Sequence, residues 1–305
     1  MSESPAFSLS TMWYQGRFDS LHDFALAARR LGYENVEISY VVPPEGFEEL
    51  ANGNTLRIIS LHAPTPRIKV GDRWSEALNL AALDDEERDV AVRLGVETLE
   101  KAARVGAHWV VFHLGGVGSI RFPEELELKR LYSDGVRGGG EVDALRHRVK
   151  LRRAEGAERY FPRAQQSLAE LAEAASRLGV AIGLEDRIHF HEFPNVDEAA
   201  ELLVGYPPEL VGYWHDVGHA EVLDRLGLGE KYRWLKELGD RTLGAHVHDV
   251  DGIVDHRAPG HGDVDWDYIA RYLPATAPRT FEINQTVPEE QVAAAIGFLR
   301  DRGVI

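Results

Sequence analysis

The sequence predicts an α/β protein, a (β/α)8 barrel built as a single domain with a long insertion after the fourth strand. Two observations lead to this prediction. Short apolar runs rich in β-branched and aromatic residues alternate with longer segments of helical period, in about eight units along the 305 residues. Histidine and carboxylate side chains recur at the ends of these runs, where a parallel barrel collects its functional groups.

Eight apolar runs are short enough to be buried strands. In chain order they span residues 7–14, 35–41, 56–62, 108–115, 180–186, 210–216, 243–249 and 279–284. The segments at 20–33, 87–107 and 163–180 repeat Leu, Ala and Val with helical spacing and reach glycine where the helix should stop. A doubly wound open sheet is the alternative, but no G-x-G-x-x-G motif follows the first strand.

Residues 116–160 are far longer than an ordinary connection between a strand and its helix. We expect this insertion to lie on the catalytic face as a lid or an interface arm, which makes a homodimer plausible. It contains a basic run that would either contact a substrate phosphate or form a solvated helix face. The run consists of Arg146, Arg148, Lys150, Arg152 and Arg153.

Composition narrows the class of protein. Fifty acidic residues against 34 Lys and Arg give a formal charge of −16, which disfavours a nucleic-acid partner and favours a small-molecule substrate. The absence of cysteine excludes disulfides, thiolate metal sites and cysteine nucleophiles. No apolar stretch is long enough to span a membrane and no signal peptide is evident, so we expect a cytoplasmic protein without a membrane partner.

Ligand-capable side chains stand at the ends of six predicted strands. They are His62, His113, Glu185, Asp216, His246 and Glu282. The last four are separated by roughly one βα unit each, so in a closed barrel they converge at its mouth. Imidazole and carboxylate ligands together suit a divalent ion such as Zn²⁺, Mn²⁺, Co²⁺ or Mg²⁺ without distinguishing among them.

Further polar residues surround this predicted site. His219 follows Asp216 by three positions and would face the same opening from the first turn of a helix. His256 and the neighbouring Arg257 follow the seventh strand and are candidate substrate contacts. Arg187, two residues after Glu185, would either bind an anionic substrate or hold that carboxylate.

Two more histidines lie close to predicted ligands along their strands. His215 precedes Asp216, and His248 follows His246 by two positions. We expect both to be hydrogen-bonded packing residues in the barrel wall rather than ligands.

Seven motifs together resemble the xylose isomerase-like TIM-barrel superfamily, which includes sugar phosphate isomerases, epimerases and endonuclease IV. In order they are LHAP, FHLGG, LEDR, HDVGHA, HVHD, HRAPGHGDVDW and FEIN, and the resemblance covers about residues 7–300. For the isomerases and epimerases it implies one divalent metal, with His219 contacting a carbohydrate substrate. The implied metal ligands are Glu185, Asp216, His246 and Glu282.

The endonuclease branch of the resemblance implies more zinc ions. His62 and His113 would join Glu185 at a second site. His219 and His256 would hold a third ion together with an aspartate two positions before His256. That position is Val254 here, and Asp255 is out of register, which argues against the third ion.

The resemblance and the residues together suggest a metal-dependent isomerase or epimerase of a sugar, sugar phosphate or polyol. The metal would act as a Lewis acid on an enediolate, and Glu185 and Glu282 would be the acid/base pair. A sugar dehydratase on the same scaffold and an endonuclease IV-like zinc phosphodiesterase are alternatives. A metal-binding or sugar-binding barrel without turnover is another.

Overall fold

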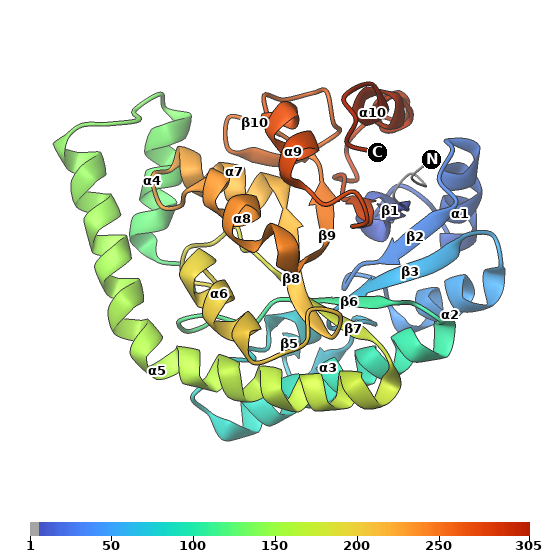
Figure 1. Cartoon of the computed structure of the whole chain (residues 1–305), viewed down its shortest axis with the longest axis horizontal. Coiled ribbons are helices and arrows are strands. Elements are labelled where there is room, and N and C mark those ends of the chain that lie inside the picture. Colours follow the sequence, from blue (N-terminus) through green and yellow to red (C-terminus); the bar gives the residue numbers. More distant parts are fainter. Residues whose placement is uncertain (1–5) are drawn as a thin grey trace.

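The computed structural model describes residues 6–305 and contains a closed barrel of eight parallel strands surrounded by helices (Figure 1). Around the barrel the strands follow the order β1-β12-β9-β8-β7-β6-β3-β2. They are β1 (Phe7–Ser10), β2 (Asn35–Ile38), β3 (Arg57–His62), β6 (Trp109–Phe112), β7 (Ala181–Glu185), β8 (Val211–Asp216), β9 (Thr242–Val247) and β12 (Arg279–Phe281). The predicted fold class is therefore confirmed.

Each predicted strand overlaps an observed one, although several are shorter than expected. The first run, 7–14, is extended only to Ser10, because the Ser10 hydroxyl accepts a hydrogen bond from the Met12 N–H and starts the 3₁₀ turn η1 (Thr11–Tyr14). The barrel order closes β1 against both β2 and β12. All strand ends that carry predicted ligands consequently lie at one rim.

Helices cover the outside of the barrel. They are α1 (Leu21–Arg30), α2 (Pro44–Gly53), α3 (Asp85–Val105), α5 (Gly140–Leu178), α6 (Val196–Val204), α7 (Val217–Arg225), α8 (Lys231–Leu238), α9 (Trp266–Tyr272) and α10 (Glu289–Asp301). Gly106 and Gly179 end α3 and α5 with φ of 71° and 67°, the left-handed conformation that glycine adopts without a steric penalty. The glycine stops expected after these two helices are thus present.

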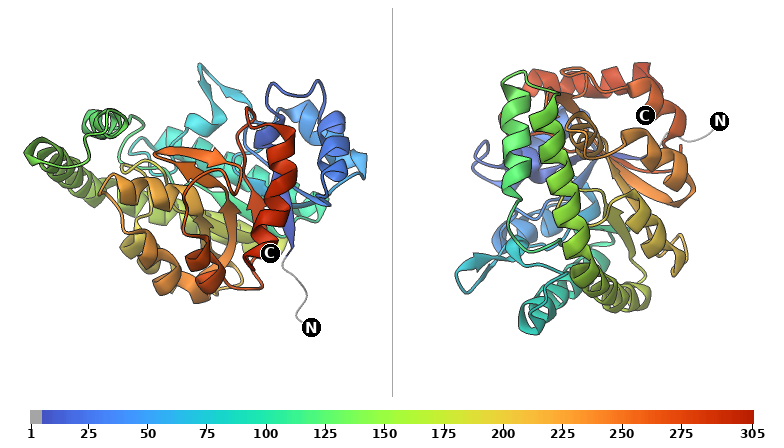
Figure 2. Two further views of the ribbon diagram at one scale, coloured as in Figure 1. Left: turned by 90° about the horizontal axis from the view of Figure 1, so that it is seen from above. Right: turned by 90° about the vertical axis from the view of Figure 1, so that its left-hand side faces the viewer.

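The long segment after β6 forms a helical hairpin. It contains α4 (Pro123–Ser133) and the first half of α5, and Figure 2 shows this hairpin extending beyond the barrel on one side. The expected end of the insertion at residue 160 falls inside the continuous helix α5. Within the basic run, Arg153 is buried and pairs with Glu198, so this arginine stabilises the packing of α5.

Short hairpins and turns complete the rim. β4 (Lys69–Val70) pairs with β5 (Arg73–Trp74), followed by the turn η2 (Ser75–Ala77). β10 (Asp249–Asp251) pairs with β11 (Val254–Arg257) directly after β9, and η3 (Gly239–Arg241) precedes β9. Both hairpins come from loops at the carboxyl ends of barrel strands, the face where such barrels build their sites.

Trp214 fills the centre of the barrel. It is fully buried on β8, two residues before Asp216, and therefore points to the same side of the strand. Glycines on the neighbouring strands make room for it, since a Cβ on Gly183 would lie 2.8 Å from the indole and one on Gly244 would overlap it. The indole thus forms an apolar floor beneath the rim.

Candidate metal centre

The ends of four consecutive barrel strands bring one imidazole and three carboxylates together. Glu185 ends β7, Asp216 ends β8, His246 lies in β9 and Glu282 directly follows β12. One potential ligand atom from each lies within 4.8 Å of the others. From His246 Nδ1 the distances are 2.6 Å to Glu185 Oε1, 3.2 Å to Glu282 Oε2 and 3.5 Å to Asp216 Oδ2. The set predicted from strand spacing therefore converges, and the role of its members as ligands stays a prediction.

Electrostatics show why these side chains suit a cation. All four are buried. Burial would raise the pKa of Glu185, but the charge of His246 and the hydrogen bonds from His113 and His246 hold that pKa well below its usual value. Burial acts in the same direction on Asp216, whose pKa is also held low by His219 and His248. Ionised carboxylates this close and this deeply buried need positive charge nearby, which the neighbouring histidines supply here and which a divalent ion would also supply.

Glu37 on β2 is a member of the site that the sequence analysis missed. Its Oε1 lies 2.9 Å from His246 Nε2, and its Oε2 accepts a hydrogen bond from the Ser60 hydroxyl at 2.8 Å. This contact leaves Nδ1 of His246 directed at the other carboxylates. A carboxylate behind a ligating histidine fixes the orientation of the ring and raises its basicity, so we expect Glu37 to act as a positioning residue.

His62 and His113 both reach the outer oxygen of Glu185. From Glu185 Oε2 the distance is 2.6 Å to His113 Nε2 and 3.4 Å to His62 Nε2. Burial, together with the charges of Arg187 and His62, lowers the pKa of His113 to about 3, so its ring is neutral.

Arg187 contacts both His113 and Glu185. Its Nη1 lies 2.7 Å from Glu185 Oε2 and 2.5 Å from His113 Nε2. Arg187 therefore contacts the carboxylate as one of its two expected roles requires, and because it also lines the large cavity its role in substrate binding stays a prediction. Its positive charge stands where a second cation shared by His62 and His113 would bind, which favours a single ion at the four strand-end residues.

Asp216 organises the histidines beside it. Its Oδ1 accepts the His219 N–H at 2.7 Å, which caps α7, and lies 2.9 Å from His248 Nε2. His248 Nδ1 accepts the backbone N–H of His256 at 2.9 Å, so Nε2 carries the proton donated to Asp216. His248 is hydrogen-bonded as expected, but the expectation that it points into the barrel wall is wrong, because it contacts Asp216 and one of its ring nitrogens lies within 4.8 Å of atoms of His256 and Glu282. His215 instead contacts the Tyr213 hydroxyl, at 2.6 Å, away from the site.

His219, Asp255 and His256 form a second group of potential ligands at the rim, with one atom from each within 4.8 Å of the others. From Val254 we predicted that no aspartate would be in place beside His219 and His256. Asp255 does approach these histidines, so that prediction is wrong. His256 has a φ of 53°, a left-handed conformation in which the chain turns and Asp255 faces the cavity despite its shifted position. Contacts of the His256 backbone with His248 and Asn284 hold this conformation.

A cavity of about 500 Å³ opens above these groups. Glu185, Glu282, His219, His256 and Arg187 all line it. Arg257, which was expected to bind substrate, is half-buried in β11 and is not part of this lining. The insertion contributes Arg121 and Lys129 to the wall.

The inserted helix α4 is attached to the loop after β7. Glu125 on α4 is buried, accepts the Phe190 N–H at 2.9 Å and lies 3.1 Å from His189 Nδ1. Lys129 completes this cluster 3.0 Å from the same carboxylate.

No helix in residues 6–305 combines the length and the apolar character needed to cross a membrane.

Several solved structures share this architecture. A D-tagatose 3-epimerase-like protein aligns with 97% of this chain and 96% of its own, at a TM-score of 0.66 and 17% identity. The IOLI protein, solved with a zinc atom, aligns over 98% of both chains at a TM-score of 0.66 and 16% identity. The 3-keto-D-glucoside 4-epimerase of E. coli covers 97% of this chain and 99% of its own, at 0.64 and 14%. These likenesses show the fold.

Sequence comparison defines the family. The uncharacterized protein y4fM of Sinorhizobium fredii is 26% identical over 215 residues, which is 63% of this chain and 67% of that protein. The family model described as xylose isomerase-like TIM barrel matches residues 25–302, from α1 to the end of α10. The chain therefore belongs to the xylose isomerase-like TIM barrel family.

Proposed function

We propose that this protein is a metal-dependent isomerase or epimerase of a sugar, sugar phosphate or polyol. One observation carries the proposal. Glu185 and Glu282 both approach His246 Nδ1, at 2.6 and 3.2 Å, at the base of a cavity of about 500 Å³ large enough for a carbohydrate. The names of the structural neighbours, which include sugar epimerases, support the same class.

The donor set fits a divalent ion. Glu185, Asp216, His246 and Glu282 would hold it, with Glu37 orienting the imidazole from behind. When bound, such an ion supplies Lewis acidity toward adjacent carbonyl and hydroxyl oxygens of a substrate. The position of Arg187 favours one ion over two.

Two carboxylates at one centre allow a proton to be removed and returned. One of Glu185 and Glu282 accepts a proton from the carbon next to the substrate carbonyl, and the C–H electron pair becomes part of an enediolate. The other carboxyl group then delivers a proton to carbon. Return to the opposite face of the same carbon is epimerisation, and return to the neighbouring carbon is isomerisation.

His219 is positioned to contact substrate oxygens. Its Nδ1 donates to the Asp186 carbonyl at 2.9 Å, which leaves Nε2 available at the cavity that His219 lines. His256 has the same arrangement, with Nδ1 donating to the Glu282 carbonyl at 2.9 Å.

Substitution of either glutamate tests the proposal. We expect Glu185→Gln and Glu282→Gln each to lower substrate proton exchange with solvent deuterium by about 10²–10⁴-fold, because the amide cannot take up the proton. Mass spectrometry of a panel of ketoses, aldoses and their phosphates measures the exchange. Glu173→Gln, on the exposed face of α5, is the matched control and keeps wild-type exchange. Near wild-type exchange in either active-site variant would contradict the assignment.

A zinc phosphodiesterase of endonuclease IV type is the second candidate, favoured by the convergence of His219, Asp255 and His256. The charge of −16 opposes it, because a phosphodiester polymer would be repelled. Cleavage of abasic-site DNA at low salt by the zinc-loaded protein would establish this candidate, and intact DNA would eliminate it. A dehydratase would differ from both by releasing water, which the product mass detects.

A further inference from the structure

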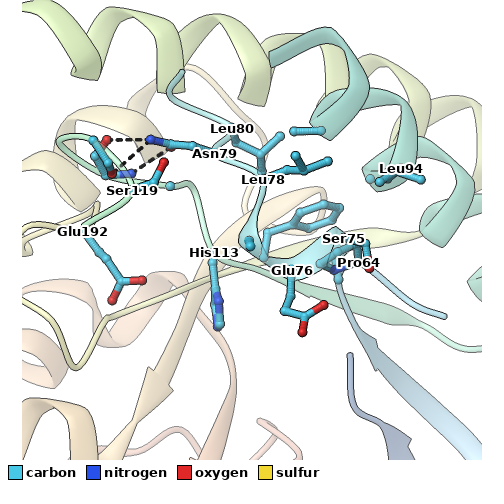
Figure 3. Close-up of a pocket in the computed structure, with 18 of the residues that line it drawn as sticks. Pro64, Ser75, Glu76, Leu78, Asn79, Leu80, Leu94, His113, Ser119 and Glu192 are labelled. Carbon is cyan, nitrogen blue, oxygen red and sulfur yellow. Dashed lines mark hydrogen bonds between the residues drawn. The ribbon is translucent and has the colours of Figure 1, made fainter. Parts of the chain in front are cut away.

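A second cavity, of about 180 Å³, lies beside the metal centre (Figure 3). Glu76, His113 and Glu192 line both this cavity and the larger one. In Figure 3 these three side chains point in a common direction, away from Leu78 and Leu80 at the far wall. Because His113 Nε2 is only 2.6 Å from Glu185 Oε2, the second cavity begins one side chain away from the proposed reaction centre.

The inner walls of this cavity are apolar. They are formed by side chains of Leu78, Leu80, Ala91, Leu94 and Phe112. The one amide side chain in the lining, Asn79, has both ends engaged. Its Nδ2 donates to the Gly116 and Gly118 carbonyls at 3.0 and 3.2 Å, and its Oδ1 accepts the Ala81 and Gly116 N–H groups at 2.9 and 3.1 Å. Asn79 therefore fixes the wall and leaves little polar capacity for a ligand.

Two of the remaining polar groups, Glu76 and Glu192, lie at the junction of the two cavities, whereas Ser75, Ser119 and His191 line the smaller cavity alone. Glu76 Oε2 and Glu192 Oε2 are buried and have no hydrogen-bond partner among residues 6–305. Buried acceptors without partners are uncommon, and the hydroxyl groups of a sugar would satisfy them. No lysine or arginine lines the smaller cavity, and these carboxylates would repel a phosphate.

The size of the cavity limits what can enter it. An apolar protein cavity of about 150 Å³ accommodates a benzene ring, so a cavity of about 180 Å³ has room for one ring. Hydroxyl-binding acceptors at the junction and an apolar wall behind them match a ligand that is polar at one end and apolar at the other.

We propose that the smaller cavity is a subsite for an apolar substituent about one ring in size, and that the natural substrate is a glycoside or similar sugar derivative carrying such a group. The subsite would hold the substituent while the sugar ring lies over Glu185 and Glu282. This inference rests on the proposed isomerase or epimerase function for the identity of the polar part.

Binding of a ring-sized probe tests the subsite without requiring turnover. The probe is 4-fluorophenol, titrated into the zinc-loaded protein and followed by fluorine NMR. We expect saturable binding with a Kd on the order of 1 mM, as for a ligand of so few atoms. Leu78→Asp should weaken that binding at least about tenfold, because it places a charge in the apolar wall.

Two further variants make the test specific. Leu83→Asp carries the same change at an exposed position of the same segment outside the lining, and should leave probe binding unchanged. Ala91→Leu fills the cavity without adding charge and should weaken binding at least about tenfold, so the result does not depend on how well Leu78→Asp folds. Absence of saturable binding, or binding insensitive to both Leu78→Asp and Ala91→Leu, would overturn the subsite.

Exchange measurements separate this inference from the proposed function. Proton exchange with solvent deuterium is measured for methyl and phenyl members of a panel of keto-glycosides. Exchange at least about tenfold more efficient for the phenyl compounds, and lost in Glu282→Gln, supports both proposals. Equal exchange of the methyl and phenyl compounds would contradict the proposed apolar substituent but would still support the proposed isomerase or epimerase function. Saturable binding of 4-fluorophenol without proton exchange in any sugar would support the subsite but contradict the proposed isomerase or epimerase function.

Discussion

At the scale of single residues, the proposed chemistry depends on one histidine ring that is contacted from both sides. Glu37 contacts Nε2 of His246 from below, and Glu185 and Glu282 face Nδ1 from above. Burial would raise the pKa of Glu37, but the neighbouring His246 lowers it, so the carboxylate is ionised behind the ring. A negative charge in that position strengthens the imidazole as a ligand.

Glu37→Gln is expected to weaken binding of Zn²⁺ or Mn²⁺ by about 10–100-fold, because the amide can still accept the Nε2–H but lacks the charge. Isothermal titration calorimetry measures the change. A purely structural role for Glu37 would lower the melting temperature without altering metal affinity. Unchanged affinity in both Glu37→Gln and Glu37→Ala would rule out the positioning role.

The sequence located the residues at strand ends better than those elsewhere. Carboxyl ends of parallel strands meet at one rim, so Glu185, Asp216 and Glu282 could be grouped by spacing alone. Glu37 lies within a strand, where an isolated carboxylate gives no indication of the groups it faces across the barrel. The approach of Asp255 depends on the left-handed backbone of His256, a conformation that sequence spacing does not report.

At the scale of secondary-structure elements, the sequence predicted that the hairpin of α4 and α5 is an insertion, but it did not predict where the hairpin contacts the barrel. Sequence marked residues 116–160 as extra chain because the connection was too long for a βα loop. It did not reveal that Glu125 of α4 would be buried against the loop after β7, since that contact joins segments about sixty residues apart. Part of the hairpin is exposed, and the homodimer expected from the insertion stays a proposal.

Attachment of α4 should depend on pH through Glu125. Burial would raise the pKa of Glu125, but hydrogen bonds and charge from His189 and Lys129 lower it below its ordinary value. Because the folded-state pKa is the lower one, the carboxylate stabilises the fold above its unfolded pKa, and this contribution disappears as pH falls through the folded value.

Glu125→Gln is therefore expected to lower the free energy of unfolding by about 1–3 kcal/mol at pH 7, with a smaller difference from wild type under acidic conditions. Urea denaturation at a series of pH values measures this. Glu127→Gln, on an exposed position of the same helix, should leave the free energy of unfolding close to that of wild type. A difference for Glu125→Gln that grows toward low pH would contradict the assignment.

At the scale of the whole molecule, the barrel places three buried carboxylates at one end, beside Arg187 and several histidines, and a divalent ion there would add to the positive charge that these carboxylates face. Binding to the native state alone stabilises it by about 2.7 kcal/mol at one hundred times the Kd. For a chain of this size, that corresponds to an increase in melting temperature of about 5 °C.

We expect added Zn²⁺, Mn²⁺ or Co²⁺ to raise the melting temperature and a chelator to reverse the effect. Asp216→Asn should abolish the response, because it removes a charged ligand while an amide oxygen can still cap α7. Asp263→Asn, at an exposed position, is the control. Differential scanning calorimetry measures the melting temperature, and elemental analysis measures the amount of bound metal. A full response in Asp216→Asn would place the ion elsewhere.

The indole of Trp214 is a fluorophore inside the barrel. Its ring centroid is 5.6 Å from that of His246, in an edge-to-face arrangement, and its Nε1 has no hydrogen-bond partner. Any change of charge on the imidazole shifts the field felt by this chromophore, which neither water nor solvent quenchers reach. The ultraviolet emission of Trp214, obtained as the difference between wild type and Trp214→Phe, would report occupancy of the metal centre in real time and without a label.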